Sequence, residues 1–192
     1  MMRIAILVGP RSRGTNMEAI IQAAKSGVLP ATVSIVVAPR EDAPALEFAR
    51  ENGAPTLVLA PNTDTYAADL QAALREHGAD IVCLAGFLSL LPASIVQSYR
   101  VMNIHPALLP AFGGKGMYGR KVHEAVLAAG VTETGCTVHW VSENYDEGEI
   151  ILQKHVPVMP DDTAETLQAR VLEQEHRAYV EALQMVCGMP AS

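Results

Sequence analysis

An amide and an imidazole lie two positions apart in the segment MNIHP at 102–106. If this segment is a β-strand, alternate side chains share a face, so Asn103 and His105 point the same way. Pro106 lacks a backbone N–H and ends the strand, which predicts that the pair lies at the C-terminal edge of a sheet. The two side chains can donate hydrogen bonds to a developing oxyanion, and His105 can also move a proton near neutral pH. A histidine with only a structural role at a strand end is the alternative.

A carboxylate that could act with this pair is Asp146, in the polar segment 142–148 between two expected strands. Aspartate favours turns for local reasons, so a role in the turn alone is one interpretation. The functional interpretation is that the turn carries Asp146 to the sheet edge that holds His105. There it could orient or charge the imidazole, or relay a proton.

The loop 9–16 joins the first expected strand to the first expected helix. A helix N-terminus presents unpaired N–H groups and the positive end of the helix dipole, which favours phosphate binding. Gly14 would let a ligand approach the backbone, and Thr15 and Asn16 add side-chain donors. The alternative is an ordinary helix N-cap formed by Thr15.

The last expected helix carries an acidic residue at an apolar position. Leu167, Val171, Tyr179 and Leu183 form a stripe at four-residue spacing, and Glu175 falls in its gap. An unpaired buried carboxylate is costly, so Glu175 must pair or face a polar pocket, where it would suit ribose hydroxyls. Alternatively, the helix is rotated and Glu175 reaches solvent.

The segment GKGMYG at 114–119 matches the pattern G-x-G-x-x-G. It does not follow the first strand of a βαβ unit, which argues against dinucleotide binding. Lys115 is followed by Gly116 rather than by Ser or Thr, which excludes a P-loop. The sequence favours a mobile lid, or simply a flexible loop.

The elements that position these residues alternate between strand and helix patterns. Apolar runs predict strands at 3–8, 32–38, 56–59, 80–85, 101–105, 135–142 and 149–158. Helical periodicity predicts helices at 15–26, 43–52, 64–77, from 92, at 120–129 and at 163–186. Repeated strand–helix units predict an α/β fold, a mostly parallel twisted sheet with helices on both faces. Residues 1–192 contain no repeat or break in composition, so we expect a single domain.

Composition restricts the classes of protein further. Hydrophobic residues make up 49% and charged residues 18%, which argues against disorder, and no apolar run is long enough to span a bilayer. Cys83, Cys136 and Cys187 lie far apart without a C-x-x-C pair. They are therefore expected to be reduced core thiols of a cytoplasmic protein, not disulfides or a zinc site.

The net charge of −7 argues against nucleic acid as a partner, because such binding requires clustered positive charge. An anionic small molecule is still compatible with local concentrations of positive charge. One positively charged group consists of Arg11 and Arg13, and the other of Lys115, Arg120 and Lys121. For each group the alternative is that its residues are solvated loop charges.

Four segments together resemble the phosphoribosylglycinamide formyltransferase branch of the folate-dependent formyltransferases: LAGF at 84–87, NIHPALLP at 103–110, GCTVHWV at 135–141 and DEG at 146–148. The resemblance covers essentially the whole chain, to QEH at 174–176. It implies a Rossmann-like formyltransferase fold and transfer of the formyl group of 10-formyltetrahydrofolate to glycinamide ribonucleotide in purine biosynthesis. The folate would be a co-substrate, and no metal is implied.

Carried over by position, the resemblance implies a catalytic trio of Asn103, His105 and Asp146. The substrate-binding residues that it implies are Gly14, Thr15, Asn16, Pro106 and Glu175. The folate-binding residues that it implies are Phe87, Leu88, Ser89, Leu90, Leu91, Asn103, Tyr145 and Asp146. The N-terminal half would form the phosphate and nucleotide side and the C-terminal half the folate side, with His123 and His139 in supporting positions.

The sequence departs from the family pattern at three places outside the trio. Ser89 stands where many members carry Arg, and the first loop and the stretch 113–119 are longer than usual. The nearest alternative function is a formyltetrahydrofolate hydrolase, which passes the formyl group to water. A catalytically silent folate or nucleotide sensor is another; a methionyl-tRNA formyltransferase would need an extra domain and a basic surface. The sequence does not indicate an oligomeric state.

Overall fold

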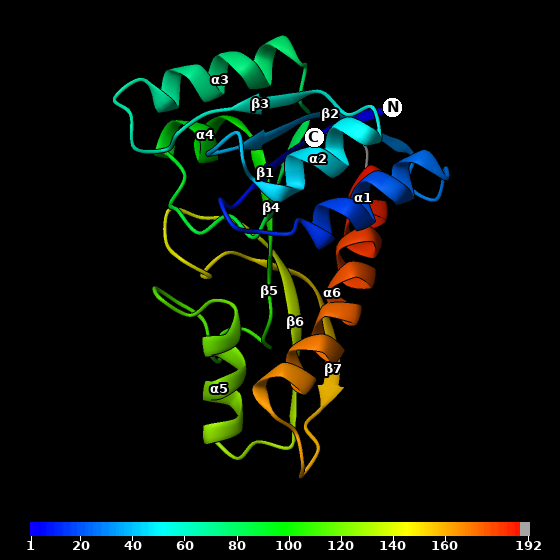
Figure 1. Ribbon diagram of the computed structural model, residues 1–192, viewed down its shortest axis with the longest axis vertical. Helices are drawn as coiled ribbons and strands as arrows, with labels where there is room; N and C mark the ends of the chain where they lie inside the picture. The colour runs from blue at the N-terminus through cyan, green and yellow to red at the C-terminus, as the bar shows by residue number, and fades with distance from the viewer. Residues whose placement is uncertain (189–192) are drawn as a thin grey trace.

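The computed structural model describes residues 1–188, and these form one seven-stranded sheet in the order β3-β2-β1-β4-β5-β6-β7 (Figure 1). Five strands run parallel: β1 (Met2–Val8), β2 (Ala31–Ala38), β3 (Thr56–Val58), β4 (Ile81–Ala85) and β5 (Arg100–His105). The last two, β6 (Glu133–Trp140) and β7 (Ile150–Pro157), extend the sheet antiparallel. The expected α/β fold with a mostly parallel sheet is confirmed.

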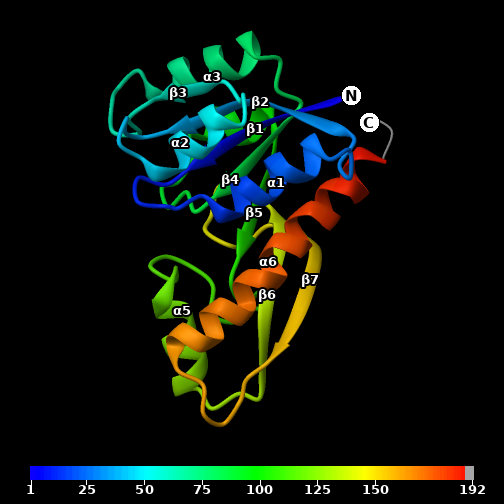
Figure 2. The ribbon, with the colours of Figure 1, turned by 45° about the vertical axis from the view of Figure 1, so that its right-hand side comes forward.

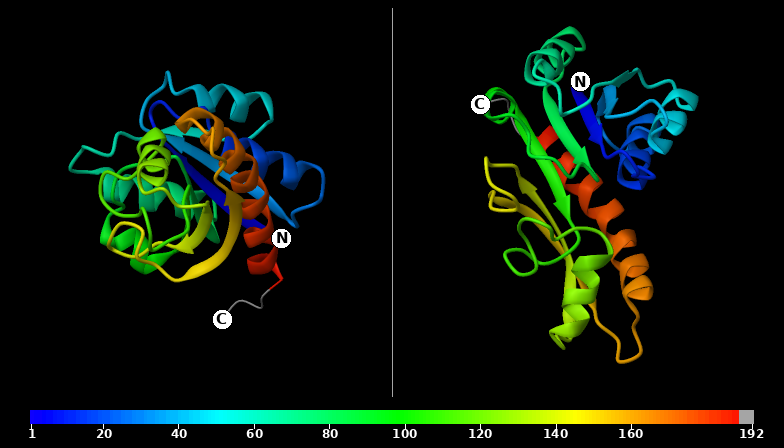
Figure 3. Two further views of the ribbon diagram at one scale, coloured as in Figure 1. Left: turned by 90° about the horizontal axis from the view of Figure 1, so that it is seen from below. Right: turned by 60° about the vertical axis from the view of Figure 1, so that its left-hand side comes forward.

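Helices cover both faces of this sheet, as the sequence predicts (Figure 3). One hydrophobic core joins the sheet to α1 (Thr15–Lys25), α2 (Pro44–Glu51) and α6 (Ala164–Cys187). The opposite core contains α3 (Tyr66–Glu76) and α4 (Ala93–Ser98). The remaining helix, α5 (Arg120–Ala128), packs against α6.

The central strand β1 shows why its sequence is apolar without alternation. Ile4 and Ile6 face the core that contains α1 and α6, whereas Ala5 and Leu7 face the core that contains α3. A strand covered on both faces needs apolar side chains at every position, and residues 4–8 are fully buried.

The long helix α6 crosses the molecule diagonally and contacts α1, β6 and β7 (Figure 2). Its N-terminus is fixed by a capping box in which Thr163 and Thr166 exchange hydrogen bonds. Further along, the hydroxyl of the fully buried Tyr179 lies 2.9 Å from the carbonyl oxygens of Leu84 and Met102. This contact ties the helix to β4 and β5 one turn beyond Glu175, and so fixes where Glu175 lies.

Among residues 1–188, no helix is both long and apolar enough to cross a membrane. The three cysteines are free. Cys83 and Cys136 are buried as expected, but Cys187 is only half-buried near the end of α6, beside Met2. Its classification as a core thiol therefore needs correction, because the last turn of α6 packs at the edge of the core.

Candidate functional site

A cleft of about 1280 Å³ lies where β1, β4 and β5 end, the edge at which open α/β sheets bind ligands. Every residue that the sequence assigned to catalysis or binding borders it except Gly14, which is buried behind it. We call Thr15, Asn16 and Glu175 the helix side of the cleft. Its strand side consists of Asn103, His105, His139 and Asp146.

His105 makes two contacts of different kinds through its ring nitrogens. The Nε2 atom lies 2.8 Å from the carbonyl oxygen of Phe112, and because a carbonyl can only accept, Nε2 carries a proton. The Nδ1 atom lies 3.5 Å from Oδ2 of Asp146, which is too long for a direct hydrogen bond. Only the imidazolium form offers a donor to both neighbours. Nδ1 makes no direct hydrogen bond in these contacts, so it is the ring nitrogen left to interact with a substrate.

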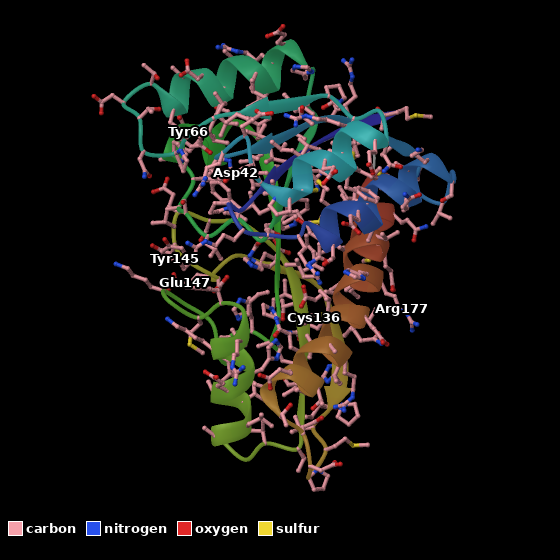
Figure 4. All side chains as sticks on the ribbon, in the orientation of Figure 1. Asp42, Tyr66, Cys136, Tyr145, Glu147 and Arg177 are labelled. Atoms are coloured by element: carbon pink, nitrogen blue, oxygen red, sulfur yellow. The ribbon has the colours of Figure 1, made fainter. Side chains whose placement is uncertain are left out.

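Asp146 reaches His105 because of an uncommon backbone conformation in the turn between β6 and β7. Its φ angle of 55° lies in the left-handed region, which aspartate tolerates better than most residues. The backbone N–H of Gly114 donates to Oδ2 at 2.9 Å, and a Cβ on Gly113 would lie 3.3 Å from that of Asp146. The glycine-rich loop therefore holds the carboxylate of Asp146 in place. The neighbouring residues Tyr145 and Glu147 are labelled at the left of Figure 4.

Asn103 faces His139, its cross-strand partner in the antiparallel pair β5–β6. Its Nδ2 atom lies 3.2 Å from Nε2 of His139, and Nδ1 of His139 lies 2.9 Å from the carbonyl oxygen of Trp140. His139 is 2% exposed, and this burial lowers the pKa of its imidazole below the usual value. Its Nε2 also lies 3.7 Å from Oδ1 of Asp146, so His139 touches two of the three expected catalytic residues.

His123, on α5, is a second buried histidine at this cleft. Burial, and then the nearby His105, lower the pKa of His123 to about 4, so it is neutral at physiological pH. Its Nδ1 atom has no hydrogen-bond partner within the described part of the chain. The sequence had placed both His123 and His139 only in supporting positions.

On the helix side, α1 begins without a side-chain cap. Gly14 occupies the N-cap position with a φ of 76°, and Thr15 is the first helical residue, so the alternative of an N-cap by Thr15 is wrong. A Cβ on Gly14 would meet that of Ala45 at 2.7 Å. The uncapped N-terminus leaves backbone N–H groups for an anionic ligand, and Arg11 also lines the cleft.

Asn16 and Glu175 form a buried polar pair on the helix side. Nδ2 of Asn16 donates to Oε2 of Glu175 at 2.8 Å, and Glu175 is 8% exposed, so the rotation of Glu175 to solvent is excluded. Burial raises the pKa of Glu175, against the lowering effect of Asn16. Oδ1 of Asn16 is buried without a partner among residues 1–188, which leaves an acceptor for a ligand hydroxyl.

The segment after β4 gives one wall of the cleft an apolar character. Leu88 and Leu90 are each 49% exposed, whereas Leu91 is buried, and Ser89 lies between them on the cleft. Half-exposed leucines beside a large cleft can cover the ring system of a flat organic ligand.

Sequence reasoning missed the contacts made by backbone atoms. The carbonyl of Phe112 and the N–H of Gly114 hold His105 and Asp146, yet neither group depends on residue type. The only signal was the run of glycines at 113, 114, 116 and 119, three of which have positive φ.

Comparison with known proteins adds independent information. The model of a family described as formyl transferase matches residues 2–183. The chain is 43% identical over 180 residues to "Phosphoribosylglycinamide formyltransferase, chloroplastic" of Vigna unguiculata, covering 91% of this chain and 58% of that protein. It is 40% identical over 192 residues to the human "Trifunctional purine biosynthetic protein adenosine-3", covering 97% of this chain and 18% of that protein.

Among solved structures, glycinamide ribonucleotide transformylase 1 from Symbiobacterium toebii has a TM-score of 0.88 and 40% identity. That match covers 97% of this chain and 87% of the other. The chain thus spans less than two thirds of the two curated relatives named above, but most of the bacterial structure.

Proposed function

Since the chain belongs to the formyl transferase family, we propose that it transfers the formyl group of 10-formyltetrahydrofolate to the amine of glycinamide ribonucleotide, a step of purine biosynthesis. The observation that carries the proposal is the meeting of Asn103, His105 and Asp146 on one wall of the cleft. The names of the relatives from Vigna unguiculata and Symbiobacterium toebii support the choice of substrates.

In this proposal residues 1–192 form one formyltransferase domain whose cleft has two ends. Gly14, Thr15 and Asn16 hold the phosphate at the N-terminus of α1, where N–H groups and the helix dipole favour an anion. Glu175 accepts hydrogen bonds from the ribose, and Pro106 borders the substrate. The folate side consists of Asn103, Asp146 and the following residues: Phe87, Leu88, Ser89, Leu90, Leu91 and Tyr145.

The chemistry begins when the primary amine of glycinamide ribonucleotide attacks the formyl carbon and a C–N bond forms. Negative charge then develops on the formyl oxygen, where the amide N–H of Asn103 and Nδ1–H of His105 stabilise it. The proton lost by the amine nitrogen passes to the folate nitrogen as its bond to carbon breaks. Asp146, beside His105, helps this transfer by holding the imidazole and accepting or relaying the proton.

Because N–H donors stabilise the oxyanion, the proposed mechanism requires no metal ion. The residues that the structure describes also include no group of three or more His, Cys, Asp or Glu side chains placed to hold one. We further propose a cytoplasmic location, supported by the three free cysteines, and small-molecule partners without nucleic acid or membrane, supported by the net charge of −7.

The deciding experiment incubates the purified protein with 10-formyltetrahydrofolate, with and without glycinamide ribonucleotide, and follows deformylation of the folate. We expect product only when the amine is present, and a loss on the order of a hundredfold in Asn103→Ala, which removes an oxyanion donor. Deformylation without the amine would identify a hydrolase instead. Binding of both ligands without turnover would identify a sensor.

A further inference from the structure

We propose that His139 is a positioning residue that sets which end of the Asn103 amide faces the reaction. This inference rests on the proposed function, because it concerns the donor side of the same oxyanion site. It assigns no contact between His139 and a substrate.

The first step concerns the proton on the His139 ring. Nδ1 lies 2.9 Å from the carbonyl oxygen of Trp140, which can only accept, so Nδ1 carries a proton. Burial lowers the pKa of the imidazole, against the raising effects of the Trp140 carbonyl and of Asp146, and so favours the neutral ring. In that ring Nε2 has a lone pair and acts as an acceptor. The tautomer is thus fixed by the backbone of the next residue.

The second step concerns the amide. An Nε2 lone pair 3.2 Å from Asn103 requires an N–H there, so the NH₂ group of Asn103 lies on the His139 side. One N–H of that group is used by His139, and the other is left for the cleft that Asn103 borders. A rotated amide would exchange its NH₂ group and its oxygen, which would remove the donor and bring an acceptor towards the oxyanion.

Two features of the backbone keep His139 in this place. It lies directly opposite Asn103 in the antiparallel register, whereas its pairing with β7 shifts between Val138 and His139. Such a bulge re-aims a side chain next to a site. In addition, a Cβ on Gly148 would lie 1.4 Å from the oxygen of Trp140, so a glycine is needed where this carbonyl turns to Nδ1.

The test compares two substitutions that each keep one half of the imidazole. His139→Asn places an amide near Nδ1, so it keeps the Trp140 contact but offers no acceptor to Asn103. His139→Gln extends to the place of Nε2 and restores that acceptor. We expect kcat of His139→Asn to fall between about tenfold and the roughly hundredfold cost of losing the donor, with KM little changed. His139→Gln should recover most of the rate.

A double-mutant cycle shows whether His139 acts through Asn103. In an Asn103→Ala background, His139→Asn should cause no further loss of kcat, because there is no amide left to orient. Equal losses in both backgrounds, or an unchanged kcat in His139→Asn alone, would overturn the proposal. Circular dichroism and thermal melting confirm that each variant is folded.

An NMR measurement on the ligand-free wild-type protein separates this inference from the proposed function. ¹⁵N shifts of the His139 ring should show a proton on Nδ1 and none on Nε2 at neutral pH. A proton on Nε2 would overturn the positioning role even in an active enzyme. If the wild-type protein fails to transfer formyl groups, the proposed function fails while the ring measurement still decides the orientation of the amide.

Discussion

The two sides of the cleft differ in how their polar groups are satisfied. On the strand side, His105, His139 and Asp146 contact each other or backbone atoms before any substrate arrives. On the helix side, the N-terminus of α1 has no cap, and Oδ1 of Asn16 is buried without a partner in the described chain. Under the proposed function, the strand side is arranged in advance for the transition state, whereas the helix side keeps polar groups for the substrate. Changes on the strand side should lower kcat, and changes on the helix side should raise KM.

The largest effect is expected for the ionisable pair of the strand side. In the proposed mechanism His105→Ala removes an oxyanion donor. Asp146→Asn removes the charge beside His105 while keeping an oxygen that can accept from Gly114. Each should lower kcat on the order of a hundredfold with a small change in KM. Steady-state kinetics on both substrates measures this split. Near-normal formyl transfer in both variants would remove the trio from the mechanism.

A smaller effect, on stability, is expected where strand-side backbones approach closely. In Gly148→Ala the new Cβ would overlap the carbonyl oxygen of Trp140, and neither backbone can move freely. We expect the free energy of unfolding to fall by about 2 kcal/mol, together with loss of activity, because the contact to His139 is displaced. Urea unfolding and kinetics on the same preparation measure both.

Gly130→Ala is the matched control for this substitution. Gly130 has a φ of 65°, but a Cβ there would meet no atom within 4 Å. Its cost should be limited to backbone strain, about 1 kcal/mol, and formyl transfer should be unchanged. Similar losses of activity in both variants would show that the Trp140 carbonyl has no special role.

The difference between the two sides also explains what the sequence could predict. The helix side follows from local rules: a strand, a glycine turn and a helix start predict an anion site, and a break in an apolar stripe points to Glu175. The fold follows similarly, because the apolar runs of β1 and β4 and the spacing of Tyr66, Leu70 and Leu74 are local patterns that the structure confirms.

The strand side depends on long-range contacts, so its residues and their shared sheet edge could be predicted but not the contacts that hold them. That Asn103 and His105 share a face follows from strand geometry, but the approach of Asp146 requires a left-handed φ that sequence does not fix. The roles of Phe112 and Gly114 arise from main-chain atoms. The antiparallel pairing of β6 with β5 and of β7 with β6 depends on contacts between strands, not on the sequence of either strand alone. No local pattern encodes these features.

On the helix side, Glu175→Gln should change binding rather than chemistry. The substitution replaces one carboxyl oxygen with an NH₂ group and so removes an acceptor for the ribose. KM for glycinamide ribonucleotide should therefore rise by about tenfold, as expected for one lost hydrogen bond, with kcat nearly unchanged. Steady-state kinetics measures both. A fall in kcat with constant KM would place Glu175 in the chemistry and contradict the division of the cleft.

The same substitution should also change how stability depends on pH. Because burial raises the pKa of Glu175, the native state binds its proton more tightly than the unfolded state does. The associated stability is complete below the usual carboxyl pKa and is lost as pH rises through the raised value. At neutral pH Glu175→Gln should therefore be more stable than wild type, with a flatter pH dependence in thermal melts. A steeper dependence would contradict the burial of this charge.

The smallest effect is expected at the start of α6, where a substitution tests whether this end of the helix contributes only to stability. In Thr163→Ala the helix loses its side-chain cap to the N–H of Thr166, which should cost about 1 kcal/mol of the free energy of unfolding. Formyl transfer should be unchanged, because Tyr179 still anchors the helix near Glu175. Thr65→Ala is the control, since Thr65 is the N-cap of α3 but makes no capping hydrogen bond. If Thr163→Ala raised KM while Thr65→Ala did not, the start of α6 would itself control the helix side, and the cleft could not be treated as a rigid frame.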